Sequence, residues 1–314
     1  MLDQLFTAGF VISFLAGAVR MSVPILLPAL GEIFTERAGI LNLGLEGIML
    51  VGSVCGFWGT YATGSLLVGL LAAVAAGILF SLVMAFLCIT VRANQIIAGT
   101  AVTILGGGLS ILIFRAVFGI RMLPPSVEIF HPLHIPLLSK IPLLGPILFQ
   151  QNLMVYLTWA LMIVSGIVLF KTTFGLKVRA VGEHPRAADS RGINVILIRY
   201  ICVMIGGGFA GLGGAFLSIG FMNTFLDQMT GGRGFIAVAV VIFSRWNPYR
   251  AMGAALIFGC ANALQLRLQA LGFPIPHQFL LAFPYVLTIL ALVSVSKRAE
   301  VPAAFTIPYT RGES

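Results

Sequence analysis

The sequence predicts an all-α fold, a polytopic membrane helix bundle of about 8–10 spans. Of the 314 residues, 59% are hydrophobic and only 9% are charged, and the mean hydropathy is +1.04. Soluble domains carry roughly 25% charged residues. Several apolar runs of about 20 residues contain few or no charges, which is the length that crosses a bilayer. Residues 1–314 are therefore expected to form a single transmembrane domain.

The basic residues indicate how the bundle is oriented. The net charge is +9, and the Lys and Arg side chains fall in short segments and at the ends of apolar runs. This is the positive-inside pattern of membrane proteins, and it argues against a nucleic-acid partner. Lys297 and Arg298 follow the last apolar run, which predicts a cytoplasmic C-terminus. The four Cys and four His residues have no metal-ligand spacing, so no metal site is expected.

Eight apolar runs are long enough to be considered as spans. They cover residues 5–31, 41–61, 66–91, 95–118, 152–170, 200–220, 251–271 and 278–296. The first run is interrupted by Arg20, Ser22 and Pro24, so it is either one kinked span or an interfacial piece followed by a short span.

Two further segments do not fit a simple span. Residues 119–151 contain six prolines, which forbid a continuous helix and predict an external Pro-rich loop. Residues 234–244 are apolar but extend only about 16 Å as a helix, half a bilayer. A re-entrant segment that leads into a short helix is expected there.

Residues 171–199 form a basic segment between two apolar runs. Six Lys or Arg residues outnumber Glu183 and Asp189. A short helix is expected to begin at Pro185, because proline fits the first helical position, and to end near Gly192. Such a helix could dock a partner, or the segment could be a loop whose charges only set orientation.

Polar residues also interrupt a membranous run at residues 31–52. Asn42 and Glu46 are four apart and share one helical face. Charged groups at membrane depth persist when they are paired, hydrated or line a cavity. The segment is either a discontinuous helix along a substrate path or a polar turn in which Glu46 has a structural partner.

Other polar side chains are predicted near membrane depth. With Asn42 and Glu46, the candidate pathway residues are Asn94, Gln95, Asn223, Arg233, Asn262 and Gln265. Amides suit neutral hydroxylated solutes, because they both donate and accept hydrogen bonds. The alternative is that they join helices to one another. Arg233 could gate an outer mouth or anchor a turn.

Three segments resemble a known transporter family. They are ALGEIFTERAGILNLGLEGIMLVGS, GLKVRAVGEHPRAADSRGINV and GRGFIAVAVVIFSRWNP. They resemble the permease subunits of ABC importers in the branched-chain amino acid, ribose and nucleoside superfamily, and are nearest to the nucleoside and simple-sugar branch. The resemblance extends from about residue 20 to residue 296.

The resemblance implies a function and a set of partners. The chain would translocate a nucleoside or simple sugar across the bacterial inner membrane, as one of a pair with a second, paralogous permease subunit. An extracytoplasmic binding protein would deliver the solute. Pro185–Gly192 would be a cytoplasmic coupling helix that docks on an ATPase. The docking residues would be Arg179, Glu183, Pro185, Arg186, Ala187, Ala188, Asp189, Arg191 and Gly192.

The source of energy is expected to lie outside this chain. The sequence has no G-x-x-x-x-G-K-[ST] phosphate loop, so ATP-Mg would bind the partner ATPase, and no cofactor is expected here. A self-contained secondary transporter or channel would need ion-coupling carboxylates in mid-span, for which Glu46 is the only good candidate. A membrane-embedded enzyme is disfavoured, because all four His residues fall between the expected spans.

Overall fold

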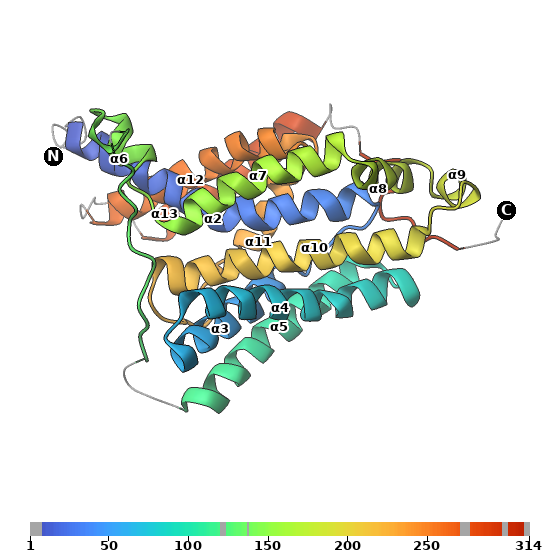
Figure 1. Ribbon diagram of the computed structural model, residues 1–314, viewed down its shortest axis with the longest axis horizontal. Coiled ribbons are helices and arrows are strands. Elements are labelled where there is room, and N and C mark those ends of the chain that lie inside the picture. Colours follow the sequence, from blue (N-terminus) through green and yellow to red (C-terminus); the bar gives the residue numbers. More distant parts are fainter. Residues whose placement is uncertain (1–7, 120–123, 137, 271–276, 297–300, 311–314) are drawn as a thin grey trace.

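The computed structural model describes residues 8–119, 124–136, 138–270, 277–296 and 301–310 (Figure 1). These residues form 12 α-helices and no β-strand. The all-α prediction is therefore confirmed for the described part of the chain. Lys297 and Arg298, on which the predicted side of the C-terminus rested, lie outside the described residues.

Most helices follow one another with connections of a few residues, and longer segments separate α5 from α6 and α10 from α11. Their bounds are α2 Ala8–Arg37, α3 Leu45–Thr63, α4 Leu66–Ala85, α5 Gln95–Phe118, α6 Leu144–Leu148, α7 Leu153–Lys171, α8 Thr173–Glu183, α9 Pro185–Ser190, α10 Val195–Ala215, α11 Arg233–Ser244, α12 Pro248–Ala270 and α13 His277–Ser296. A π-helical turn extends α4 over Phe86–Thr90, and another extends α10 over Phe216–Phe221.

Six of these helices are long and apolar enough to cross a membrane, which makes the chain a multi-pass membrane protein. They are α2, α4, α5, α7, α10 and α12, counted with the π-helical turns. Two others, α3 and α13, have 19 and 20 residues, or about 30 Å each. The number of spans, 8–10, stays a prediction.

Helix α2 is a single helix of 30 residues with Pro24 and Pro28 inside it. The first apolar run is therefore one span and not two pieces. Neighbouring helices let a membrane helix tolerate a proline, because they pack around the freed backbone groups. Helix α2 lies against α10, α11 and α12, and it supplies residues to both hydrophobic clusters of the core.

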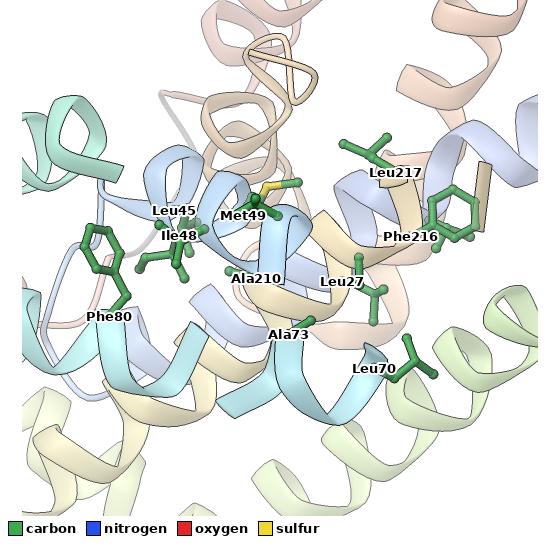
Figure 2. Packing of buried hydrophobic residues seen from close by; sticks show 14 of the residues in the cluster. Leu27, Leu45, Ile48, Met49, Leu70, Ala73, Phe80, Ala210, Phe216 and Leu217 are labelled. Atoms are coloured by element: carbon green, nitrogen blue, oxygen red, sulfur yellow. The ribbon is translucent and has the colours of Figure 1, made fainter. Parts of the chain in front are cut away.

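The core forms where α2, α3, α4 and α10 meet. Figure 2 shows Leu27 of α2, Met49 of α3, Ala73 of α4 and Ala210 of α10 gathered in one cluster. In α10 the glycines allow close approach of backbones, because a Cβ at Gly214 would collide with the carbonyl oxygen of Met49. The glycine-rich run therefore serves helix packing, as small residues commonly do in membranes.

The two ends of the bundle differ. Helices α8 and α9 lie at one end with the last described residues, and α6 lies at the other (Figure 1). As predicted, the described parts of residues 119–151 have no continuous helix, only a 3-10 turn and the five-residue α6. The extended part of this loop joins the segment after α10, because Val127 N donates to the Asn223 carbonyl at 2.9 Å.

Candidate functional site

Glu46 joins the beginnings of α3 and α11 inside the bundle. Its Oε1 accepts hydrogen bonds from Thr230 Oγ1 at 2.6 Å and from Gly232 N at 2.7 Å. Its Oε2 accepts from Gly234 N at 2.6 Å. The carboxylate therefore caps α11, where the exposed amides of a helix N-terminus favour negative charge. Glu46 thus has a structural partner, the 230–234 turn.

The glycines of this turn explain how the carboxylate approaches so closely. Gly232 has φ +78°, in the left-handed region that favours glycine. A Cβ at Gly234 would lie 2.6 Å from Glu46 N, so no side chain fits there. Sequence analysis considered this turn for Arg233 alone and missed the role of the turn as a partner of Glu46. The paired glycines before a short apolar helix were the available signal.

Residues 38–44 connect α2 to α3 without a helix, and side chains satisfy their backbone groups. Asn42 N donates to Glu32 Oε1 at 2.7 Å, and Leu41 N donates to Gln95 Oε1 at 2.8 Å. Asn42 Oδ1 accepts from Gly44 N at 3.0 Å. Buried backbone groups outside a helix require such partners. Asn42 and Gln95 are buried and hold this connection in place.

Asn94 and Asn223 have separate positions. Asn94 caps α5, because its Oδ1 accepts from Ile96 N at 3.0 Å and from Ile97 N at 3.3 Å. Asn223 is exposed and has φ +56°, and its carbonyl accepts the hydrogen bond from Val127. Neither residue lines the pocket formed by the remaining candidates.

Arg233, Asn262 and Gln265 line one pocket of about 190 Å³ between α11, α12 and α13. The other lining residues are Gly231, Ile236, Pro284 and Tyr285. These three residues are up to 32 positions apart in the sequence (265 − 233), and they meet at one polar site. This pocket is the part of the predicted pathway set that the structure brings together.

The side chains around this pocket are held by the surrounding backbone. Arg233 Nη1 donates to the carbonyls of Thr230 at 2.9 Å and Met229 at 3.2 Å. Tyr285 Oη donates to the Gly231 carbonyl at 2.7 Å, and Asn262 Nδ2 donates to Phe258 O at 2.9 Å. Arg233 therefore anchors the turn, and its guanidinium also borders the pocket.

The basic segment contains the expected short helix. Helix α9 spans Pro185–Ser190 with Pro185 at its start, and Gly192 has φ +81° just after it. Arg186, Ala187 and Arg191 are exposed. The prediction of a helix that begins at proline and stops at glycine is confirmed.

Several other residues of the predicted docking set are engaged within the chain. Ala188 is only 5% exposed and packs in the core with Val178 and Val195. Arg179 lies over the Phe170 ring, with 5.8 Å between Cζ and the ring centroid. The exposed surface of this set is therefore smaller than the sequence suggested, because one face of α9 is used to pack against α8 and α10.

Residues 301–310 tie this end of the bundle together, a feature that sequence analysis missed. Ala304 N donates to Gly182 O of α8 at 2.9 Å. Thr306 N donates to Gly39 O in the α2–α3 connection at 3.0 Å. This tail therefore bridges α8 and residues 38–44.

Arg199 holds the same tail from α10. It is 1% exposed, its Nε donates to Ala38 O at 3.1 Å, and its Nη1 donates to Ile307 O at 3.1 Å. The sequence placed Arg199 at the end of the basic loop. In the structure α10 begins earlier, at Val195, so this side chain lies inside the bundle.

A second carboxylate links α2 to the turn after α11. Trp246 Nε1 donates to Glu36 Oε2 at 2.5 Å, and Arg37 Nη2 donates to Trp246 O at 3.4 Å. Trp246 is 1% exposed and has φ +54°. In the part of the chain that the structure describes, no group of three or more His, Cys, Asp or Glu side chains is placed to hold a metal ion.

Comparison with known proteins identifies the family of this chain. The family described as branched-chain amino acid transport system / permease component matches residues 14–292. The guanosine ABC transporter permease protein NupQ of Bacillus subtilis is 42% identical over 304 residues, 93% of this chain and 94% of that protein. The putative glucose ABC transporter permease protein TsgC13 of Haloferax volcanii is 37% identical, over 96% of this chain and 98% of that protein.

A third relative aligns over a similar share of this chain. The nucleoside ABC transporter permease protein NupC of Lactococcus lactis is 35% identical over 311 residues, 95% of this chain and 96% of that protein. The family match covers most of the chain, and each of these relatives aligns with it almost from end to end. The chain therefore belongs to the permease components of the branched-chain amino acid transport system family.

Proposed function

We propose that this chain is the membrane-spanning subunit of an ABC importer and that it translocates a nucleoside or a simple sugar. The observation that carries the proposal is the near full-length similarity to permeases named for guanosine, nucleosides and glucose. As a permease component, the chain is a non-catalytic transport subunit. ATP-Mg would be bound and hydrolysed by a partner ATPase, and a solute-binding protein would deliver the solute.

The exposed face of α9 is the proposed docking site for the ATPase. Arg186 and Arg191 are exposed at the two ends of the helix, and Ala187 is exposed between them. A short helix fixed by Pro185 and by its packing on α8 and α10 is a rigid element. Its positive charge suits an acidic groove, because complementary charge steers association.

This docking site defines a topology for the chain. The end of the bundle with α8, α9 and residues 301–310 would be cytoplasmic, and the 119–151 loop would face outside. Helices α3 and α13 would add two spans to the six described above. Residues 221–232 with α11 would form a re-entrant segment, since the 12 residues of α11 extend only about 18 Å. The subunit would lie in the bacterial plasma membrane, paired with a second, paralogous permease subunit.

A series of contacts that leads from α9 to the pocket suggests how docking of the ATPase would affect the solute. Helix α8 is bonded to the tail, the tail to residues 38–44, and these residues lead directly into α3. Glu46 in the first turn of α3 holds the start of α11, which carries Arg233. A shift of α9 would therefore be passed along bonded elements to the pocket.

The alternative of a secondary transporter has less support in the geometry. An ion-coupling carboxylate must exchange its ion during each cycle. Both oxygens of Glu46 are already hydrogen-bonded, by two backbone amides and one hydroxyl. The carboxylate that this alternative requires therefore has a structural task.

Neighbouring alanines on α9 provide the experiment that tests docking. In proteoliposomes that hold the whole importer, Ala187→Asp should lower solute-stimulated ATPase activity about tenfold or more, because an acidic side chain on a docking face opposes an acidic groove. The same variant should keep the thermal stability of the wild type, since Ala187 is exposed.

Two control variants separate docking from folding. Ala188→Asp places a carboxylate in the core beside Val178, so it should lower stability and membrane yield. Lys177→Glu changes an exposed charge on α8 and should leave ATPase stimulation near the wild-type value. If Ala187→Asp supports normal uptake and ATPase stimulation, α9 is not the docking element.

A further inference from the structure

We propose that the pocket between α11, α12 and α13 binds the vicinal diol of a sugar ring, either the ribose of a nucleoside or a free hexose. This inference rests on the proposed function and names the chemical group that the chain would recognise. It is carried by three polar side chains of this pocket, Arg233, Asn262 and Gln265. Their chemistry and the size of the site decide which part of a solute fits.

Arg233 presents an unused hydrogen-bonding edge. Its Nη1 is committed to the carbonyls of Met229 and Thr230, which fixes the plane of the guanidinium. Its Nε is covered by surrounding atoms in this structure and has no hydrogen-bond partner among the described residues. Nε–H and one N–H of Nη2 lie along the same edge of a guanidinium, so this edge can donate to two neighbouring oxygens when the pocket opens around it. Two hydroxyls on adjacent carbons supply such a pair.

The charge of this site suits a neutral solute. The backbone amides on either side of Arg233, those of Gly232 and Gly234, are bonded to the Glu46 carboxylate. Glu46 therefore lies close to Arg233 and balances its positive charge. An anionic solute would gain less from Arg233 than from an isolated arginine, because the nearby carboxylate repels it. Hydroxyl groups bring no charge and meet no such repulsion.

The amides on α12 complete what a diol requires. A hydroxyl group both donates and accepts, whereas a guanidinium can only donate. Asn262 Nδ2 is bonded to Phe258 O, so this amide turns its donor toward its own helix and leaves its oxygen as the acceptor. Gln265 is three residues further on and borders the same pocket. The pocket thus combines a donor edge with amide acceptors.

The size of the pocket favours one ring over a whole solute. Its volume is about 190 Å³, below the roughly 300–1,000 Å³ of pockets that enclose a drug-sized ligand. Tyr285 is the one aromatic residue among the seven lining residues. A nucleobase commonly stacks on aromatic faces, and this site has one such ring at its edge. A sugar ring that is held by its hydroxyls fits better.

The test compares the uptake of each solute with that of its deoxy analogue, in the wild type and in variants of the pocket. Initial uptake into proteoliposomes with the whole importer is measured for guanosine and 2′,3′-dideoxyguanosine, and separately for glucose and 2-deoxyglucose. Each pair is compared in the wild type, Arg233→Gln and Gln265→Leu. Because every assay contains the same binding protein, the ratio of variant to wild type for each solute isolates the contribution of the permease.

The inference predicts that the two variants affect the parent solute more than its deoxy analogue. Both variants should lower uptake of the solute with the intact diol, by about tenfold for Arg233→Gln, the loss expected for hydrogen bonds to a charged group. Uptake of the deoxy analogue should fall much less. The control Arg115→Gln removes an exposed side chain that lies 3.8 Å from Asp227, away from the pocket, and should leave both ratios unchanged.

Two other results would contradict the diol site or the proposed function. If both variants lower uptake of the parent solute and the analogue by equal factors, the pocket does not bind the diol. Gln265→Leu keeps this outcome decisive, because no hydrogen bond of Gln265 supports the turn that Arg233 anchors. If the wild type imports neither nucleosides nor sugars, the proposed function fails, and the diol site fails with it. The solute pair that shows this difference identifies whether the diol belongs to a nucleoside or to a free hexose.

Discussion

Glu46 illustrates how a charge is accommodated inside a membrane bundle. It is 5% exposed, and its partners are backbone amides and a hydroxyl, with no cation bonded to it. Hydrogen bonds to an ionised group are about twice as strong as those between neutral groups. The N-terminus of α11 adds a favourable partial charge. One carboxylate thus accepts the hydrogen bonds of two amides in this turn.

This arrangement predicts a large loss of stability when Glu46 changes. Glu46→Ala leaves three donors without their acceptor, two of them buried and one half-buried, and should lower the free energy of unfolding by on the order of 3 kcal/mol or more. Glu46→Gln keeps the shape but turns an NH₂ group toward one of the donors, so its loss should be intermediate. Thermal unfolding in detergent measures both.

Glu128 provides the matched control for this prediction. It is exposed in the 119–151 loop, so Glu128→Gln should unfold at the wild-type temperature. Glu46→Gln with wild-type stability would show that the carboxylate is not needed to hold α11. Solute uptake by the same variants then tells whether the start of α11 must be fixed for transport.

Among the elements, α10 shows how glycine sets the distance between helices. Its glycines allow the backbone of α10 to touch those of α3 and α4. Such contacts stabilise a membrane bundle by dispersion and weak polar interactions, because lipid provides no hydrophobic drive between helices. The expected consequence is that a single added methyl group on this face disturbs the packing.

A pair of glycine substitutions tests this expectation. Gly214→Ala should lower the free energy of unfolding by about 1–3 kcal/mol, because its Cβ meets the Met49 carbonyl oxygen and backbone must move. Gly253→Ala, on α12, has open space around its Cβ and should be neutral or stabilise by up to about 1 kcal/mol. Thermal unfolding of both variants checks the sign, and equal effects would contradict the packing argument.

For the whole molecule, the tail over residues 301–310 connects parts that the chain keeps far apart. It bonds to Gly182 on α8, to Gly39 between α2 and α3, and to Arg199 on α10. Arg199 loses one of its two backbone acceptors without this tail. The tail therefore stiffens the end of the bundle where docking is proposed.

Truncation before residue 301 tests the role of the tail. The variant should still insert, because the described membrane helices end before that residue. Amide hydrogen exchange of residues 38–44 should become faster, since Gly39 loses its bond from Thr306, and Arg199, which holds Ala38, loses its bond to Ile307. Solute-stimulated ATPase activity should fall relative to basal activity. Unchanged exchange and unchanged stimulation would remove the tail from the coupling path.

Much of the fold could be predicted because it depends on local chemistry. The bilayer requires long apolar helices, so composition alone indicated the spans. Proline and glycine have strong local preferences, so both ends of α9 were correctly expected. The pathway residues are harder to predict, because a polar residue at membrane depth can line a path or hold backbone and the sequence does not separate the two. Asn42, Gln95 and Glu46 do the latter.

The helical bundle, the short α9 and the resemblance to a transporter family could all be inferred from the sequence, because periodicity, hydropathy and motif chemistry are properties of neighbouring residues. The folded structure was needed to find that Arg233, Asn262 and Gln265 share a pocket, that Ala188 is buried and that the tail holds Arg199. These are contacts between segments that are distant in sequence. Such contacts depend on how helices pack, and no local pattern in the chain records them.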